Sequence, residues 1–189
     1  VDNSPTIEAR DGYQIVRLRP VFSPLGNAFL PTLPFQIANQ RDSYDIIHAH
    51  SHLFFATNIC ALMRKGNSTP LVITNHGIIS ASAPARLQSI YLNTIAKWTY
   101  AEADKVICYT DEDKEGLEKI GVSRDKIETI PNGIDTELFS ACPRRTLSNQ
   151  ILWAGRFVPG KGVNYLVDAF ADISNRFSEL RLVLVGDGP

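Results

Sequence analysis

The sequence lacks the cysteine pairs, the long apolar run and the charge excess that define several common classes of protein. Its three cysteines are Cys60, Cys108 and Cys142, and no C-x-x-C pair occurs. An odd number of widely spaced cysteines argues against a disulfide framework and indicates reduced thiols. No apolar run reaches the roughly 20 residues that a transmembrane helix needs. We therefore expect a cytoplasmic protein, and association with the inner face of the membrane stays open.

The chain also has almost no net charge. Its 189 residues carry a formal charge of −1 at pH 7, so no global field favours nucleic acid or an anionic membrane. We expect no nucleic-acid partner, and any preference for an anion must be local. The length suffices for one full domain and part of a second.

Short apolar segments alternate with segments of helical periodicity. The strand patterns lie at residues 13–19, 44–50, 70–74, 105–109, 127–130, 150–154 and 180–185. The helical patterns lie at residues 32–40, 53–65, 84–103 and 162–177, with another from the N-cap Thr110 to the stop at Gly121. Such alternation predicts an α/β fold, with a parallel sheet that helices cover on both faces.

A polar stretch without periodicity divides the chain. Residues 140–149, with the sequence SACPRRTLSN, are typical of a linker. We therefore expect a first domain over 1–140, a linker over 141–149 and the start of a second domain over 150–189. The chain begins with Val1 rather than Met and stops in the Gly-rich turn of LRLVLVGDGP, so we expect a fragment that lacks both ends.

The stretch GRFVPGKG joins a strand pattern to a helix pattern. Ligands of open α/β sheets bind where strands end, and a helix N-terminus there offers unpaired N–H groups. Arg156 adds a forked donor and Lys161 a point charge, both suited to phosphate oxygens. Gly155, Gly160 and Gly162 allow the backbone to approach a ligand closely. A solvated turn and an anion site are both possible interpretations of this stretch. It is not a Walker P-loop, because that motif requires Ser or Thr after the lysine.

Three of the four histidines alternate in DIIHAHSHL. On one continuing strand, His48, His50 and His52 would all face the same side. Imidazoles are common metal ligands, but no aspartate follows His50 at the spacing of a metallohydrolase and no distant ligand set completes a metal sphere. The alternatives are that these side chains line the carboxyl end of a parallel strand or pair with neighbours. The fourth, His76, follows a buried strand in ITNHGIIS, where a loop histidine bonded to backbone is the plain interpretation.

Two further patterns have structural interpretations. Asn132-Gly133 is suited to a turn because both residue types tolerate positive φ. The aromatic residues Tyr91, Trp98 and Tyr100 lie on the longest helical pattern, and an aromatic stripe at helical spacing is typical of a core-facing helix.

The runs AGRFVPGKGVNYLVDAF…LRLVLVGDGP, IPNGIDTELF and DIIHAHS…PLVITNHG resemble the retaining glycosyltransferases of family 4, which have the GT-B fold. The resemblance implies two Rossmann-like domains that face each other across a cleft, with a nucleotide-sugar donor mostly on the second. Arg156 and Lys161, next to Gly155, match the family's pair that holds the donor diphosphate. His76 with Gly77 matches the HG loop, whose histidine acts as a catalytic residue against the donor sugar and whose glycine belongs to the substrate-binding residues.

The resemblance therefore implies an enzyme. It would transfer a sugar from a nucleotide-diphosphate sugar to a glycan, lipid or polyisoprenyl acceptor with retention of configuration, without a metal or other cofactor. A sugar-nucleotide epimerase of the same architecture, a non-catalytic nucleotide-binding module and a metal-dependent hydrolase are the alternatives. The family's glycine-rich loop would precede Val1 and its glutamate pair would follow Pro189, so we expect this length of chain alone to be inactive.

Overall fold

The structure is a computed structural model, and it describes residues 6–40, 43–64, 66, 68–79, 84–140 and 149–188. The chain divides into two compact units, Val1–Gly133 and Ile134–Pro189. The expected linker falls largely on residues 141–148, which lie outside the described residues, so it stays a prediction. Among the helices of the described residues, none combines the length and the apolar character of a membrane span.

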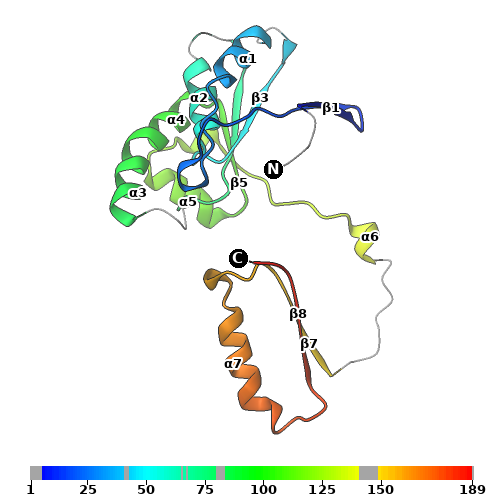
Figure 1. The fold of residues 1–189 in the computed structure, drawn as a ribbon. Helices are drawn as coiled ribbons and strands as arrows, with labels where there is room; N and C mark the ends of the chain where they lie inside the picture. The colour runs from blue at the N-terminus through cyan, green and yellow to red at the C-terminus, as the bar shows by residue number, and fades with distance from the viewer. Residues whose placement is uncertain are drawn as a thin grey trace. The chain divides into compact units, whose positions relative to one another are not determined.

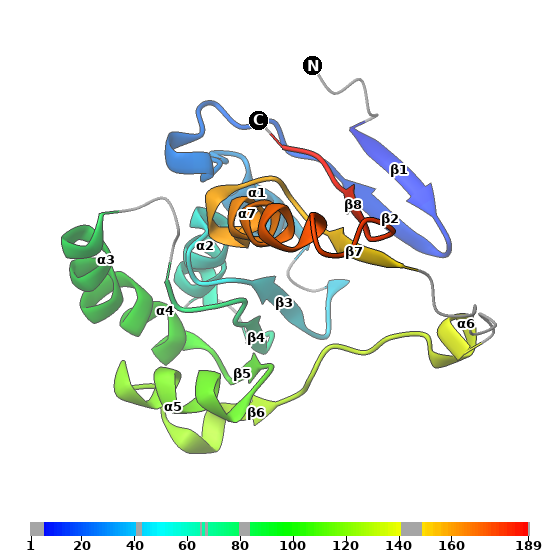
Figure 2. The same cartoon turned by 90° about the horizontal axis from the view of Figure 1, so that it is seen from below.

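A four-stranded parallel sheet organises the first unit. Its strands are β3 (Ile47–His50), β4 (Leu71–Thr74), β5 (Lys105–Cys108) and β6 (Ile127–Thr129). They lie side by side in chain order and every pair is parallel (Figures 1 and 2). The parallel α/β fold expected from the alternating patterns is confirmed, and all four carboxyl ends meet at one edge.

Helical segments precede and connect these strands. They are α1 (Leu33–Gln40), α2 (Phe55–Arg64), α3 (Ala85–Tyr91), the π-helical η3 (Leu92–Ala96), α4 (Lys97–Glu102), α5 (Asp111–Lys119) and the short 3-10 turns η1 (Pro24–Gly26) and η4 (Arg124–Lys126). The helix expected over 84–103 is thus one helical run with a π segment in the middle. Thr110 caps α5 as expected, because its side chain accepts a hydrogen bond from the N–H of Asp113 at 3.1 Å.

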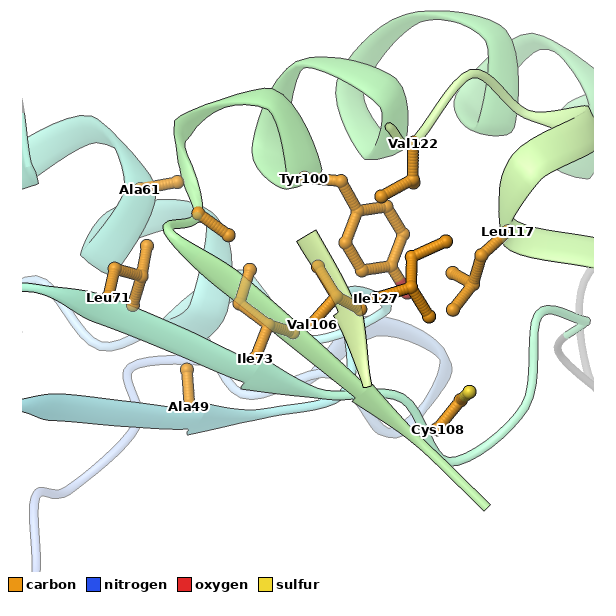
Figure 3. Close-up of a cluster of buried hydrophobic side chains, with 11 residues drawn as sticks. Ala49, Ala61, Leu71, Ile73, Tyr100, Val106, Cys108, Leu117, Val122 and Ile127 are labelled. Carbon is orange, nitrogen blue, oxygen red and sulfur yellow. The ribbon is translucent and has the colours of Figure 1, made fainter. Parts of the chain in front are cut away.

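The core of the first unit lies between the sheet and three of its helices. Figure 3 shows Ala61 of α2, Tyr100 of α4 and Leu117 of α5 over the strands, facing side chains that include Leu71, Ile73 and Val106. These three strand side chains are fully buried, and each contributes about 1.5–3 kcal/mol through burial. This packing fixes the strands whose ends carry the site.

Tyr100 and Trp98 of the α3–α4 run belong to this core, as expected, whereas Tyr91 is not part of the cluster. Tyr100 is 1% exposed, Trp98 packs against the cluster, and Tyr91 is half-buried. Their helical spacing therefore reflects packing.

Two N-terminal strands form a hairpin outside the parallel sheet (Figure 1). β1 (Ile7–Arg10) pairs antiparallel with β2 (Tyr13–Val16). The strand expected over 13–19 is therefore shorter than the pattern indicated, and its partner was not predicted. The turn is Asp11-Gly12, with φ of 49° and 86°, which is a favoured hairpin dipeptide.

The second unit contains one strand–helix–strand segment. β7 (Gln150–Ala154) pairs parallel with β8 (Arg181–Val185), and α7 (Val163–Ser174) connects them after the 3-10 turn η5 (Pro159–Lys161). A short helix, α6 (Thr136–Ser140), lies earlier in the same unit. No residue of α7 is fully buried, and Val167 of the helix and Phe177 beyond its end are exposed.

The turn expected at Asn132-Gly133 is wrong. Residues 130–135 contain neither a turn nor a bend, and Gly133 is not among the glycines with positive φ. The segment after β6 therefore continues without reversing, so the dipeptide's tolerance of positive φ is not used.

Candidate active site

Three histidines gather at the carboxyl edge of the parallel sheet. His48 and His50 lie on β3, and His76 lies two residues beyond β4. Because His50 pairs with Thr74 in the strand register, the loop after β4 begins beside it. The ring centroids of His48 and His50 are 4.6 Å apart, and those of His50 and His76 are 5.2 Å apart. All three rings are exposed, so the cluster is accessible to a ligand.

Hydrogen bonds connect His76 to both neighbouring strands. His76 Nε2 lies 2.9 Å from His50 Nδ1, and His76 Nδ1 lies 2.9 Å from the hydroxyl of Tyr109. Tyr109 directly follows β5 and was not identified from the sequence. The only signal for it was its position, because a residue after a parallel strand reaches the same sheet edge as its neighbours.

His52 does not join this cluster. Ser51 has a φ of 62°, a left-handed conformation that is uncommon for a residue with a side chain. This reverses the chain after β3 and places His52 inside the unit with 0% exposure. The expectation that His48, His50 and His52 face one side is therefore wrong for His52, since it assumed that the strand continues.

A buried polar network holds the residue before His76. The hydroxyl of Tyr100 lies 2.7 Å from His52 Nδ1 and donates to Asn75 Oδ1 at 3.0 Å. The N–H of Asn75 donates to the carbonyl of Ile107 at 2.8 Å. Asn75 is thereby tied to α4 and β5, which fixes where His76 and Gly77 leave the sheet. Gly77 follows with a φ of 116°, a conformation that favours glycine.

Two histidines have pKa values below that of a free imidazole. Desolvation lowers the pKa of His52 to about 4, opposed by the Asn75 side chain and the Ile78 backbone. The Nε2 atom of His52 is buried and forms no hydrogen bond with any described residue. The pKa of His48 is also lowered, chiefly by desolvation and next by the charges of His50 and His76. Nε2 of His48 lies 2.7 Å from the Thr74 hydroxyl. Both rings are therefore neutral at pH 7.

The buried neutral state of His52 predicts a stability that depends on pH. The unfolded state takes up a proton near pH 6.5, whereas the folded state takes it up only near pH 4. The contribution is therefore complete above pH 6.5 and is lost as the pH falls toward 4. We expect the free energy of unfolding to drop by about 2 kcal/mol from pH 7 to pH 5 on account of this group. Urea titrations of the wild type and His52→Gln at both pH values measure it, and an equal pH dependence in the two proteins would contradict the assignment.

No group of three or more His, Cys, Asp or Glu side chains within the described ranges is arranged to hold a metal ion. The exposed imidazoles instead bond to one another and to hydroxyl groups. This arrangement offers hydrogen-bond donors and acceptors to a polar ligand.

The second unit carries the other residues singled out in the sequence. Arg156 comes two residues after β7, and Lys161 ends η5 immediately before Gly162. Gly162 has a φ of 66° and forms the N-cap of α7, so the turn enters the helix through a conformation that favours glycine. Arg156 and Lys161 are both exposed.

The start of α7 offers unpaired donors. In the part of the chain that the structure describes, the N–H groups of Val163, Asn164 and Tyr165 have no hydrogen-bond acceptor. The side chains of Arg156 and Lys161 likewise have no hydrogen bond or ion pair with any described residue. A helix N-terminus with two such cations nearby suits an anion with several oxygens.

Glycines bring the turn after β8 against the turn after β7. A Cβ on Gly186 would lie 1.8 Å from the carbonyl oxygen of Gly155, and one on Gly188 would lie 2.6 Å from that of Phe157. The N–H of Phe157 donates to the carbonyl of Asp187 at 2.9 Å. The GDG of the LVGDGP run therefore supports the turn that carries Arg156. The Cβ position of Gly155 faces the Trp153 ring at 3.2 Å.

Solved structures define the class of fold. HepE from Anabaena, in complex with UDP-glucose, matches with a TM-score of 0.63 at 21% identity, over 84% of this chain and 44% of that one. The catalytic domain of starch synthase IV from Arabidopsis thaliana, bound to ADP and acarbose, matches with a TM-score of 0.60 at 17% identity, over 97% and 53%. The chain therefore has part of the GT-B glycosyltransferase fold.

Sequence comparison identifies the family. The model of Glycosyltransferase Family 4 matches residues 2–138, and the chain belongs to this family. The gpi3 subunit of phosphatidylinositol N-acetylglucosaminyltransferase from Schizosaccharomyces pombe is 26% identical over 79% of this chain and 33% of its own length. GDP-mannose:cellobiosyl-diphosphopolyprenol alpha-mannosyltransferase from Xanthomonas campestris is 25% identical over 85% and 42%. The chain thus spans less than half the length of these relatives.

Proposed function

We propose that the protein carrying this chain transfers a sugar from a nucleotide-diphosphate sugar to an acceptor, with retention of the anomeric configuration. The observation that carries the proposal is the start of α7. Two exposed cations without protein partners in the described part of the chain, Arg156 and Lys161, lie there beside unpaired backbone N–H groups. A diphosphate has the charge and the number of oxygens to engage them together.

The names of similar proteins support the choice of donor and acceptor. HepE was crystallised with UDP-glucose, and the Xanthomonas relative is named for a GDP-mannose donor. The acceptors in the two relatives' names are phosphatidylinositol and a diphosphopolyprenol. Lipid and polyisoprenyl acceptors are therefore the first to test, ahead of free glycans.

His76 is the proposed catalytic residue, and Gly77 gives its loop the required bend. In this role the imidazole lies against the donor sugar and stabilises the charge that develops as the diphosphate departs. Catalysis of this kind depends on positioning and on electrostatic stabilisation rather than on a strong base. Gly155, Arg156 and Lys161 hold the departing group.

An assay of the full-length protein with nucleotide sugars tests the proposal. Donor is incubated with and without lipid-linked acceptors, and NMR records the products and the configuration of any new glycosidic bond. We expect acceptor-dependent transfer with retention. Conversion of the donor without an acceptor would indicate an epimerase instead, and binding without turnover would indicate a nucleotide-binding module.

A further inference from the structure

The contacts of His76 form a chain of three side chains from three different elements. The hydroxyl of Tyr109 meets Nδ1 of His76, and Nε2 of His76 meets Nδ1 of His50, each at 2.9 Å. Both ring nitrogens of His76 are therefore engaged by protein. The Nε2 atom of His50 has no hydrogen-bond partner among the described residues, and the His50 side chain is exposed.

The direction of the hydrogen bonds along this chain follows from the chemistry of its members. A neutral imidazole has one nitrogen that donates and one that accepts. If the Tyr109 hydroxyl donates, Nδ1 of His76 is the acceptor and its proton must be on Nε2. That N–H then donates to Nδ1 of His50, so the proton of His50 is also on Nε2. One phenol group thus determines the tautomer of two histidines.

The reverse direction is less favourable. It would require Nδ1–H of both rings to donate, with the Tyr109 oxygen as the final acceptor and its own proton directed elsewhere. No other acceptor for the Tyr109 hydroxyl occurs among the described residues. Either direction leaves one donor without a partner in this chain of side chains, the Nε2–H of His50 or the O–H of Tyr109. A phenol O–H is, however, a stronger donor than the N–H of a neutral imidazole, and an imidazole nitrogen is a stronger acceptor than a phenol oxygen.

We propose that Tyr109 is a positioning residue that holds His76 as its Nε2–H tautomer, and that this leaves His50 with an Nε2–H donor available to an oxygen of the bound substrate. The ring of His48 lies tilted against that of His50, with the centroids 4.6 Å apart. The hydroxyl of Thr74 lies 2.7 Å from Nε2 of His48 and holds that ring in place. His50 is thus a second ligand-facing group next to His76. Its contact with substrate rests on the proposed function, whereas the tautomers do not.

Nitrogen NMR of the histidine rings tests the tautomers directly. Long-range ¹H–¹⁵N spectra distinguish an N–H nitrogen from a bare one, and single His→Gln variants assign the four rings. We expect His76 and His50 to be Nε2–H tautomers above pH 7.5. In Tyr109→Phe, which removes only the hydroxyl, the Nδ1 signal of His76 should shift toward an N–H nitrogen and that of His50 should change with it.

The matched control is Tyr44→Phe. It also removes a hydrogen-bonded tyrosine hydroxyl, the one that donates to Gln40 in the same unit, and it should leave both rings unchanged. Wild-type His76 as an Nδ1–H tautomer would overturn the proposal even if no variant folds. Unchanged His76 nitrogens in folded Tyr109→Phe would overturn it as well.

Kinetics of the full-length protein separate this proposal from the proposed function. If sugar transfer is observed, Tyr109→Phe should lower kcat by roughly fivefold to tenfold with little change in KM for the donor. A shift of the ring ¹⁵N signals together with an unchanged fold and an unchanged KM would indicate positioning. If the hydroxyl were only structural, its loss would change the fold or KM as well. If no transfer is observed, the NMR result still decides the tautomers.

Discussion

Replacing Arg156 and Lys161 together by alanine is expected to weaken binding of a nucleotide-diphosphate sugar by about 10²- to 10⁴-fold. Both cations are exposed and lack protein partners in the described part of the chain, so they are available to an anion. Each charged hydrogen bond to phosphate contributes about 1.5–3 kcal/mol. Arg156→Ala and Lys161→Ala alone should each weaken binding by about one to two orders of magnitude.

Calorimetric titration of the full-length protein with a panel of nucleotide sugars, and with the matching nucleosides, measures the effect. The nucleosides lack phosphate, so their affinity should not change. Arg176→Ala is the matched control, because this arginine lies beyond the opposite end of α7 in the same unit and its loss should have no effect on donor binding. Unchanged donor affinity in the double variant would remove the phosphate site from the proposal.

The sequence was most informative where a pattern is both local and repeated. The apolar runs that became β4 and β5 predicted buried parallel strands, and Thr110 with its acidic neighbours predicted the start of α5. Parallel strands also place their carboxyl ends at one edge. That rule explains why His50 and His76 lie together although 26 residues separate them.

The sequence failed where a feature depends on one backbone angle or on packing between distant segments. Ser51 adopts a φ of 62°, and no glycine marks that position, so the burial of His52 could not be anticipated. Tyr109 belongs to no motif, and its contact with His76 exists only because β4 and β5 are neighbours in register. The hairpin was different, because Asp11-Gly12 is a recognisable signal that was overlooked.

Replacing Gly186 by alanine is expected to destabilise the second unit by about 2 to 6 kcal/mol. Gly186 has a φ of 156°, and a Cβ there would lie 1.8 Å from the carbonyl oxygen of Gly155. The atoms that a Cβ would meet belong to the backbone of Gly155 rather than to a flexible side chain, so the turns after β7 and β8 must move apart. Because Arg156 follows Gly155, the same displacement should weaken donor binding.

Gly160→Ala is the matched control for this substitution. Gly160 lies in η5 of the same unit, has no positive φ, and has open space where a Cβ would be placed. Trp153 of β7 reports on this unit, since its ring stacks on Phe157 with the centroids 5.2 Å apart. A Trp98→Phe background leaves Trp153 as the single tryptophan of these 189 residues. We expect the urea midpoint of Trp153 fluorescence to fall for Gly186→Ala and to stay unchanged for Gly160→Ala. Equal midpoints would mean that the two turns can separate without cost, and Gly186 would then have no part in holding the arginine in place.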